Sequence, residues 1–71
     1  MLTATQCRMA RGALNWLVKD VADRTGLSAN TVSRFEGGAK ANVTTQKLIR
    51  EAFEKEGVRF TERGVEPPSG E

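Results

Sequence analysis

A glycine turn between two short helical segments is the feature that most constrains the fold of this 71-residue chain. In the stretch TGLSANTVSRFEGG, residues 25–38, Gly26 is placed to end one helix in a left-handed turn. Ser28 is a good N-cap for the next helix, and Leu27 and Val32 can form a hydrophobic staple around its first turn. The pattern predicts a short helix over residues 28–37 that starts two residues after a sharp turn.

The outward face of this predicted helix is polar. Its apolar positions, Val32 and Phe35, are expected to face inward. The residues left on the outside are short or polar: Ala29, Asn30, Ser33 and Arg34.

Two helices are expected before this one. Thr3 and Gln6 fit a capping box that starts a helix running to about Leu14, with Leu2 and Cys7 placed as a staple and Asn15 able to end it. The second helix begins near Trp16 or Leu17 without a clear N-cap. It is expected to bury Leu17, Val21 and Ala22 and to leave Val18 exposed.

A fourth helix and a short strand follow. Val43 and Thr44 are read as staple and N-cap of a helix that ends at Gly57 and carries an apolar stripe of Leu48, Ile49, Ala52 and Phe53. The segment 58–60 alternates apolar and basic residues and predicts a strand, and residues 62–71 are expected to form a mobile tail.

Length and charge limit the function. A domain of this size buries only about 60% of the surface that its unfolded chain exposes, so a partner subunit is plausible. Residues 1–47 hold seven basic and three acidic side chains, giving +4, whereas residues 48–71 hold four basic and six acidic ones, giving −2. This asymmetry favours a polyanionic partner for the first part, with ordinary solvated charges as the alternative.

Several classes of protein are not expected. Cys7 is the only cysteine and there is no histidine, which argues against a disulfide, a zinc site of Cys and His, and a Cys–His nucleophile; Cys7 is instead expected to be a small core residue. Gly37 and Gly38 lack the spacing of a phosphate-binding loop. We therefore expect no enzyme, no cofactor and no metal. No apolar run is long enough for a signal peptide or a membrane span, and a cytoplasmic location is expected.

Residues 16–38, WLVKDVADRTGLSANTVSRFEGG, resemble the helix-turn-helix of the lambda-repressor-like proteins, the Cro/CI or XRE family of phage and bacterial regulators. The matching features are the Val-Ala pair at 21–22, Gly26 at the turn, Leu-Ser after it, Thr-Val at 31–32, and the ending FEGG. The resemblance implies an all-α bundle of about four helices over residues 1–61. It also implies a repressor or other transcription regulator that binds double-stranded DNA with the helix 28–37 in the major groove.

The resemblance also implies which residues contact DNA. Asn30 matches a base-reading position and is suited to an adenine edge, and Arg34 can reach guanine or a phosphate; simple solvation is the alternative for both. Lys40 and Asn42 match a loop that contacts the DNA backbone. The full set expected to contact DNA is Ser28, Ala29, Asn30, Thr31, Ser33, Arg34, Lys40, Asn42, Lys19 and Arg8.

One departure from the family pattern supports a different function. Leu17 and Val18 stand where the family usually has a capping residue followed by a phosphate-binding Gln. An exposed Val18 beside Trp16 would fit a contact with another protein, although core packing is the favoured interpretation of Trp16. The alternative is therefore a protein-interaction module of the same fold, an antitoxin-like or phage accessory partner with reduced DNA binding.

Two further roles are assigned. Arg11 and Glu36 match family positions that form an ion pair between the first helix and the recognition helix, with a phosphate contact as the alternative for Arg11. A homodimer is expected through Val58, Phe60 and Phe53, because the strand predicted over residues 58–60 has an unpaired edge and Phe60 is too apolar to be left in water. In the competing interpretation, Phe60 folds back over the core of its own subunit.

Overall fold

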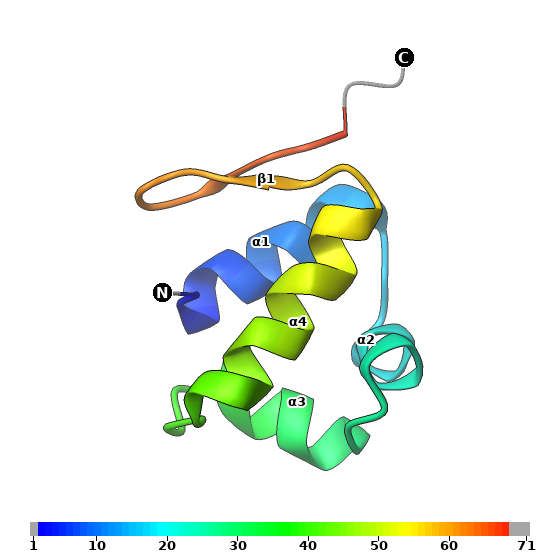
Figure 1. The fold of residues 1–71 in the computed structure, drawn as a ribbon, viewed down its shortest axis with the longest axis vertical. Coiled ribbons are helices and arrows are strands. Elements are labelled where there is room, and N and C mark those ends of the chain that lie inside the picture. Colours follow the sequence, from blue (N-terminus) through cyan, green and yellow to red (C-terminus); the bar gives the residue numbers. More distant parts are fainter. Residues whose placement is uncertain (1, 69–71) are drawn as a thin grey trace.

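The computed structural model describes residues 2–68, which form four helices and one two-stranded antiparallel sheet. The elements are α1 (Ala4–Leu14), α2 (Val18–Thr25), α3 (Ala29–Glu36), α4 (Val43–Lys55), β1 (Arg59–Phe60) and β2 (Val65–Glu66). In Figure 1, α4 crosses the front of the molecule, α3 lies at its lower end, and the hairpin of β1 and β2 lies across its upper end. The chain is thus a small all-α bundle with a C-terminal hairpin, and the predicted fold class is confirmed.

The first helix begins and ends as its sequence predicts. The Thr3 hydroxyl accepts a hydrogen bond from the Gln6 amide at 3.0 Å, and the Gln6 side-chain oxygen accepts one from the Thr3 amide at 3.1 Å. Asn15 ends the helix in the left-handed conformation, with φ of 58°. Leu2 and Cys7 are both buried, as a staple requires.

The start of α2 corrects one expectation about burial. The carboxylate of Asp20 accepts a hydrogen bond from the Leu17 amide at 2.8 Å and so caps the helix. This register turns Val18 inward against the core, together with Val21 and Ala22. Leu17 is 61% exposed, so the predicted burial of Leu17 and exposure of Val18 are both wrong.

The cap of α3 agrees with the sequence, whereas that of α4 does not. The Ser28 hydroxyl accepts from the Thr31 amide at 3.0 Å, and Val32 and Phe35 are buried. The N-cap of α4 is Asn42, whose side-chain oxygen accepts from the Thr45 amide at 2.7 Å, and not Thr44.

The earlier start of α4 changes its apolar stripe at the edges. Val43 lies in the first turn and is 73% exposed, and Leu48 is 37% exposed, in contrast to the predicted stripe. Ile49, Ala52 and Phe53 are buried as expected.

The core joins all four helices to the start of the hairpin. Trp16 stacks on Phe53 with ring centroids 5.5 Å apart, and Phe60 meets Phe53 edge-on at 6.2 Å. The guanidinium of Arg24, a residue of α2, lies 4.2 Å from the centroid of the Trp16 ring. Trp16 is therefore a packing residue, as the favoured interpretation expects.

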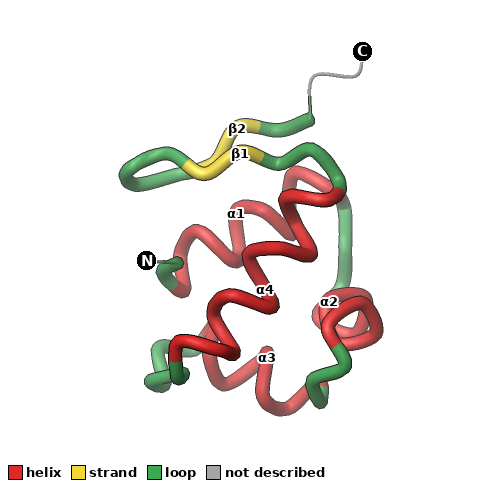
Figure 2. Tube along the Cα trace, in the orientation of Figure 1, coloured by secondary structure: helices red, strands yellow, loops and turns green. Residues whose placement is uncertain are grey.

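The C-terminal segment is more ordered than its sequence suggests. β1 pairs with β2 in antiparallel register, Arg59 opposite Glu66 and Phe60 opposite Val65. Figure 2 shows the two strands side by side. Residues 62–66 thus form a turn and a strand, which corrects the tail expected from residue 62; residues 69–71 of that tail lie outside the described part of the chain. The edge of β1 that was expected to be unpaired has a partner in its own chain.

Two of the three residues assigned to a dimer interface are interior. Phe53 has no exposed surface and Val58 is 1% exposed, so neither can contact a second subunit without unfolding; both assignments are corrected. Phe60 is half-buried against Phe53, as in the competing interpretation. Across residues 2–68, no helix combines the length and the apolar character needed to cross a membrane.

Candidate nucleic-acid interface

The outer face of α3 carries polar side chains with little packing against the rest of the domain. Thr31 is half-buried. The other outward residues are exposed: Ser28, Ala29, Asn30, Ser33 and Arg34. Because Val32 and Phe35 anchor the opposite face in the core, the helix is fixed while its outer side chains stay accessible.

The turn before α3 sets its direction. Gly26 has φ of +80°, a conformation that side chains other than glycine rarely adopt, and only Leu27 and Ser28 separate it from α3. In Figure 1, α2 is seen nearly along its axis whereas α3 lies across the view, so the two helices run in clearly different directions. The turn therefore places α3 at the surface with its N-terminal end free.

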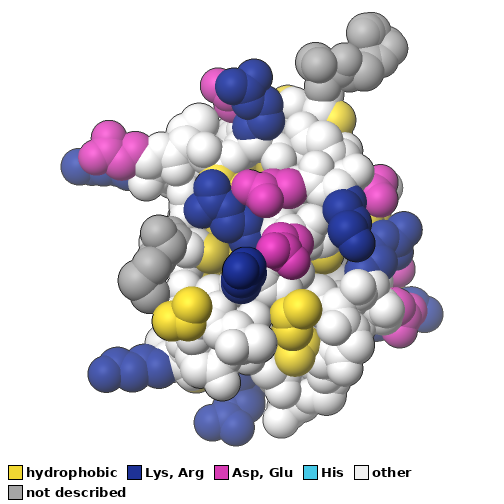
Figure 3. Space-filling model, viewed as in Figure 1, with side chains coloured by type: hydrophobic (Ala, Val, Ile, Leu, Met, Phe, Trp, Pro, Cys, Tyr) yellow, Lys and Arg dark blue, Asp and Glu magenta, His cyan; other side chains and the backbone are white. Residues whose placement is uncertain are grey.

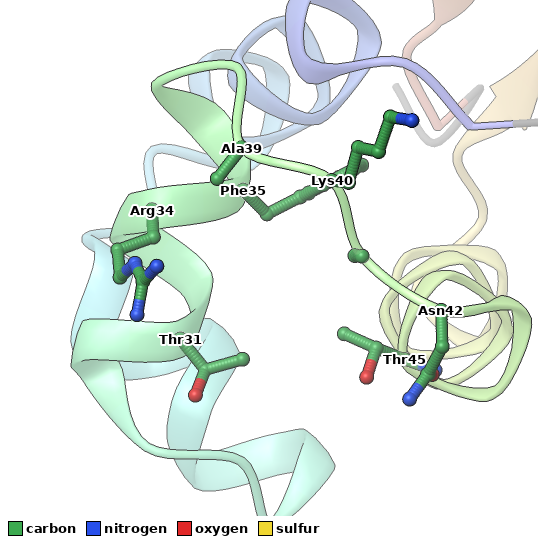
Figure 4. Close-up of a pocket in the computed structure, with 8 residues that line it drawn as sticks. Thr31, Arg34, Phe35, Ala39, Lys40, Asn42 and Thr45 are labelled. Atoms are coloured by element: carbon green, nitrogen blue, oxygen red, sulfur yellow. The ribbon is translucent and has the colours of Figure 1, made fainter.

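A polar concavity of about 220 Å³ lies between α3 and the start of α4. It is lined by Thr31, Arg34, Phe35, Ala39, Lys40, Ala41, Asn42 and Thr45. Figure 4 shows Thr31 and Thr45 on opposite sides of the gap, with Arg34 on the α3 side and Lys40 extending from the loop away from the gap. Four of the residues expected to contact DNA are thus brought together here, with Lys40 at the rim.

Some of these polar groups already have partners within the chain. The Ser28 and Thr31 hydroxyls lie 2.9 Å apart in a mutual hydrogen bond. The side-chain oxygen of Asn42 caps α4, which leaves its amide nitrogen as the donor for a ligand. Ser28 and Asn42 therefore have a structural role as caps besides any contact with a ligand.

Arg8 and Lys19 lie apart from this concavity. Arg8 donates to the main-chain carbonyl oxygen of Glu36 and, at 3.2 Å, to the Thr5 hydroxyl. Its guanidinium is therefore hydrogen-bonded at the C-terminal end of α3, although the side chain as a whole is exposed. Lys19 is exposed on the first turn of α2 and does not line the concavity.

The expected ion pair between Arg11 and Glu36 is present. Arg11 donates from Nε to one carboxylate oxygen at 2.8 Å and from Nη2 to the other at 2.9 Å. It also donates from Nη1 to the Trp16 carbonyl at 3.1 Å, and the Cys7 thiol donates to Glu36 at 3.2 Å. The carboxylate of Glu36 is thus bound on both oxygens although it is only 7% exposed.

These contacts set the charge state of the group. Burial by itself would raise the pKa of Glu36, but the hydrogen bonds from Arg11 and Cys7 and the charges of Arg11 and Arg8 lower it below its ordinary value. Burial raises the pKa of the Cys7 thiol, and the hydrogen bond to Glu36 adds to that effect. Glu36 is therefore ionised and Cys7 is a neutral donor at neutral pH.

Charge is distributed unevenly over the surface. In Figure 3, basic side chains project at the lower end of the molecule, where α3 lies, whereas acidic and basic side chains are mixed over the middle and the top. The end that carries the exposed face of α3 is thus the more suitable one for an anionic partner.

One residue of this region was not assigned from the sequence: Thr45, which lines the concavity opposite α3. Arg8 was assigned to DNA, and its contact with Glu36 had no local signal because the acceptor is a main-chain carbonyl 28 residues away. Among residues 2–68, no three Cys, Asp or Glu side chains are grouped as a metal site would need.

Comparisons with known proteins add no relative. Neither a scan against protein-family models nor searches of curated proteins and of solved structures found a match to this chain.

Proposed function

We propose that this chain is a sequence-specific regulator of transcription that binds double-stranded DNA with α3 in the major groove. The observation that carries the proposal is the exposed polar face of α3, next to a polar concavity at the basic end of the molecule. The major groove is about 12 Å wide and admits one helix, whose N-terminal side chains then reach base edges. The resemblance of residues 16–38 to lambda-repressor-like regulators supports the same function.

Two side chains are suited to read bases. Asn30 and Arg34 lie one turn apart on the exposed face, separated by about 6 Å along the helix axis, which is close to two base steps of 3.4 Å. An Asn amide fits an adenine edge and an Arg guanidinium fits a guanine edge. We therefore propose a half-site in which an adenine and a guanine are separated by about two base steps.

The concavity between α3 and α4 is suited to the sugar-phosphate backbone beside that half-site. The Asn42 amide and the Lys40 ammonium line it or its rim. Such contacts position the protein and contribute affinity without selecting a sequence.

Selection of bound sequences from a random pool of duplex DNA tests the proposal. We expect an enriched motif, with affinity that falls steeply as salt rises because counterions are released. Asn30→Ala should relax the preference at one base pair, at a cost of about 1–3 kcal/mol, whereas Lys40→Ala should weaken all sequences alike. An unenriched pool and binding that is insensitive to salt would contradict DNA recognition.

A homodimer remains part of the proposal, although its interface needs residues other than Phe53 and Val58. One recognition helix reads too few base pairs to find a site in a genome, and two subunits related by a two-fold axis read half-sites about 34 Å apart. A two-fold symmetric motif in the selected pool, and a dimer in sedimentation of the DNA-bound protein, are the expected results. A single half-site bound by a monomer would contradict the dimer.

The alternative function is a protein-interaction module. The observation that favours it is Leu17, which is 61% exposed at the start of α2. Docking through apolar surface would persist at salt concentrations that abolish phosphate contacts. Leu17→Ser would then weaken binding to the protein partner, whereas DNA binding as proposed above would keep its affinity in this variant.

A further inference from the structure

The C-terminal end of α3 is attached to α1 at two different atoms of one residue. Arg11 and Cys7 bind the side-chain carboxylate of Glu36, and Arg8 donates to its main-chain carbonyl. All three donors lie within two turns of α1. The far end of the recognition helix is thus held by the first helix of the bundle.

With the hydrogen bond from Arg8, every main-chain carbonyl group in the last turn of α3 has a donor. The final carbonyl groups of a helix lack partners within the helix. The chain that follows supplies donors for the preceding ones: the Gly37 amide for Ser33, the Ala39 amide for Arg34, and the Gly38 amide for Phe35. The carbonyl of Glu36 receives its hydrogen bond from Arg8. A cation at this point also opposes the negative end of the helix dipole.

From this geometry we propose that Arg8 is a positioning residue, which fixes the angle of α3 through the Glu36 carbonyl and makes no phosphate contact of its own. The proposal rests on the proposed function, because the angle of α3 matters only if its side chains meet a ligand. In this role Arg8 affects which DNA sequence is preferred, whereas a direct phosphate contact would affect the affinity for all DNA sequences.

Val32 and Phe35 already hold α3 in the core, so the two attachments at Glu36 limit the small tilt that this packing leaves. The Glu36 carboxylate sits on rotatable side-chain bonds, so the pair with Arg11 fixes a point but not a direction. Asn30 lies six residues before Glu36, about 9 Å along the axis, so a tilt of roughly 6° at Glu36 moves it by about 1 Å. That displacement exceeds the few tenths of an ångström that a bidentate hydrogen bond tolerates. Holding the main chain of Glu36 as well removes this freedom.

The test compares Arg8→Met with Arg8→Lys and with Lys47→Met. Methionine keeps an unbranched stem but removes the donor, and lysine restores one donor for the carbonyl. Lys47 is an exposed basic residue on α4 outside the concavity, so its variant controls for the loss of one positive charge. Each protein is titrated with the selected sequence and with random duplex DNA over a series of salt concentrations.

We expect Arg8→Met to lose about tenfold in the ratio of affinities for selected and random DNA, which is within the range that one misplaced base contact produces. The slope of log affinity against log salt should stay as in the parent protein, and Arg8→Lys should recover most of the ratio. Lys47→Met should leave the ratio unchanged. Equal losses on both DNAs, with a slope smaller by about 0.9, would show a direct phosphate contact and overturn the proposal. An unchanged ratio would overturn it too.

Hydrogen exchange in the free protein makes this failure distinguishable from failure of the proposed function. Arg8→Met should accelerate exchange of the amides at residues 34–38, while thermal unfolding remains cooperative with an intact core. If the parent protein selects no DNA sequence, the proposed function fails, and the exchange data still decide whether Arg8 holds the end of α3. Unchanged exchange at these amides would overturn the positioning role regardless of DNA binding.

Discussion

Replacing Arg11 by methionine tests whether the fold depends on the ion pair beneath α3. Glu36 is 7% exposed and receives hydrogen bonds from Arg11 at 2.8 and 2.9 Å. Methionine retains much of the aliphatic stem but has no donor, so the carboxylate would keep only the Cys7 thiol, 3.2 Å away. The substitution therefore removes the charge pairing with a limited change in packing.

The expected loss of stability is large for a domain of this size. Removing one partner of a buried ion pair costs about 3–5 kcal/mol, because the remaining charge is uncompensated. The Arg11 side chain is 24% exposed, so water can reach the vacated site, and we expect about 3 kcal/mol. The total free energy of unfolding of such a domain is roughly 4–10 kcal/mol. At about 4–8 °C for each kcal/mol, the melting temperature should fall by roughly 12–24 °C.

Thermal unfolding followed by circular dichroism, beside a titration with DNA, measures both effects. The control is Arg50→Met, because the Arg50–Glu54 pair at 2.9 Å joins side chains that are 41% and 44% exposed. With the contact of Arg50 to the Phe60 ring included, its loss should cost about 1–1.5 kcal/mol, well below the loss expected for Arg11→Met. If Arg11→Met loses DNA affinity but keeps its melting temperature, Arg11 is a phosphate contact and the structural argument is wrong.

Three further predictions concern acid, the hairpin and the turn. Because the pKa of Glu36 is lowered in the fold, its ion pair stabilises the protein above the unfolded-state pKa, near 4.5, and this stability is lost as the pH falls through the folded-state pKa. The stability of Glu36→Gln should therefore depend less steeply on pH below 4.5 than that of the parent protein. An equal dependence would contradict the ion pair. The side-chain amide of Gln6 donates to the carbonyl oxygens of Thr61 and Gly64 in the hairpin turn, at 2.7 and 3.2 Å. Gln6→Ala should therefore lower the free energy of unfolding by about 1–3 kcal/mol and accelerate hydrogen exchange of the Thr61 amide. Slow exchange of that amide in the variant would exclude this attachment. In urea unfolding, Gly26→Ala should lower the free energy of unfolding by about 1–2 kcal/mol, because Gly26 has a positive φ. Gly12 lies within α1 and a methyl group there would meet no other atom, so Gly12→Ala should raise the free energy of unfolding by about 0.5–1 kcal/mol. Equal effects of the two substitutions would refute the conformational argument.

Local signals in the sequence were sufficient where a helix begins on its own residues. Thr3 with Gln6, and Ser28 with Thr31, form caps within four positions, so their hydrogen bonds could be inferred without knowledge of the fold. The left-handed conformations at Asn15 and Gly26 follow from residue type in the same way. These signals placed α1 and α3 correctly.

Burial was mispredicted where two neighbouring apolar residues compete for one core position. The order Trp-Leu-Val gives no local reason to choose Leu17 or Val18. Asp20 decides it by capping at Leu17, which fixes the helical register and turns Val18 inward. The start of α4 was mispredicted for a different reason: Asn42 and Thr44 can both cap a helix, and Asn42 does so, which leaves Val43 in an exposed first turn.

Contacts between distant segments were not readable from the sequence. β2 has two residues, too few to show an alternating pattern, and Gln6 reaches the hairpin turn from more than 50 positions away. Burial of Phe53 and Val58 beneath that hairpin removes them from any dimer interface. The charge of Arg8 suggested a DNA contact, but its position beside the last turn of α3 gives it an acceptor inside the protein.

In the proposed function, the outer face of α3 meets the DNA and its inner end holds the helix in the bundle. The outer side chains of Ala29, Asn30 and Ser33 are exposed, so substitutions there alter what the helix offers to a ligand with little effect on the core. At the inner end, Glu36 takes hydrogen bonds on its side chain and its main chain, and changes to these donors alter stability or the angle of the helix. Sequence preference on the outer face can therefore change without loss of the fold, as long as the attachment to α1 is kept.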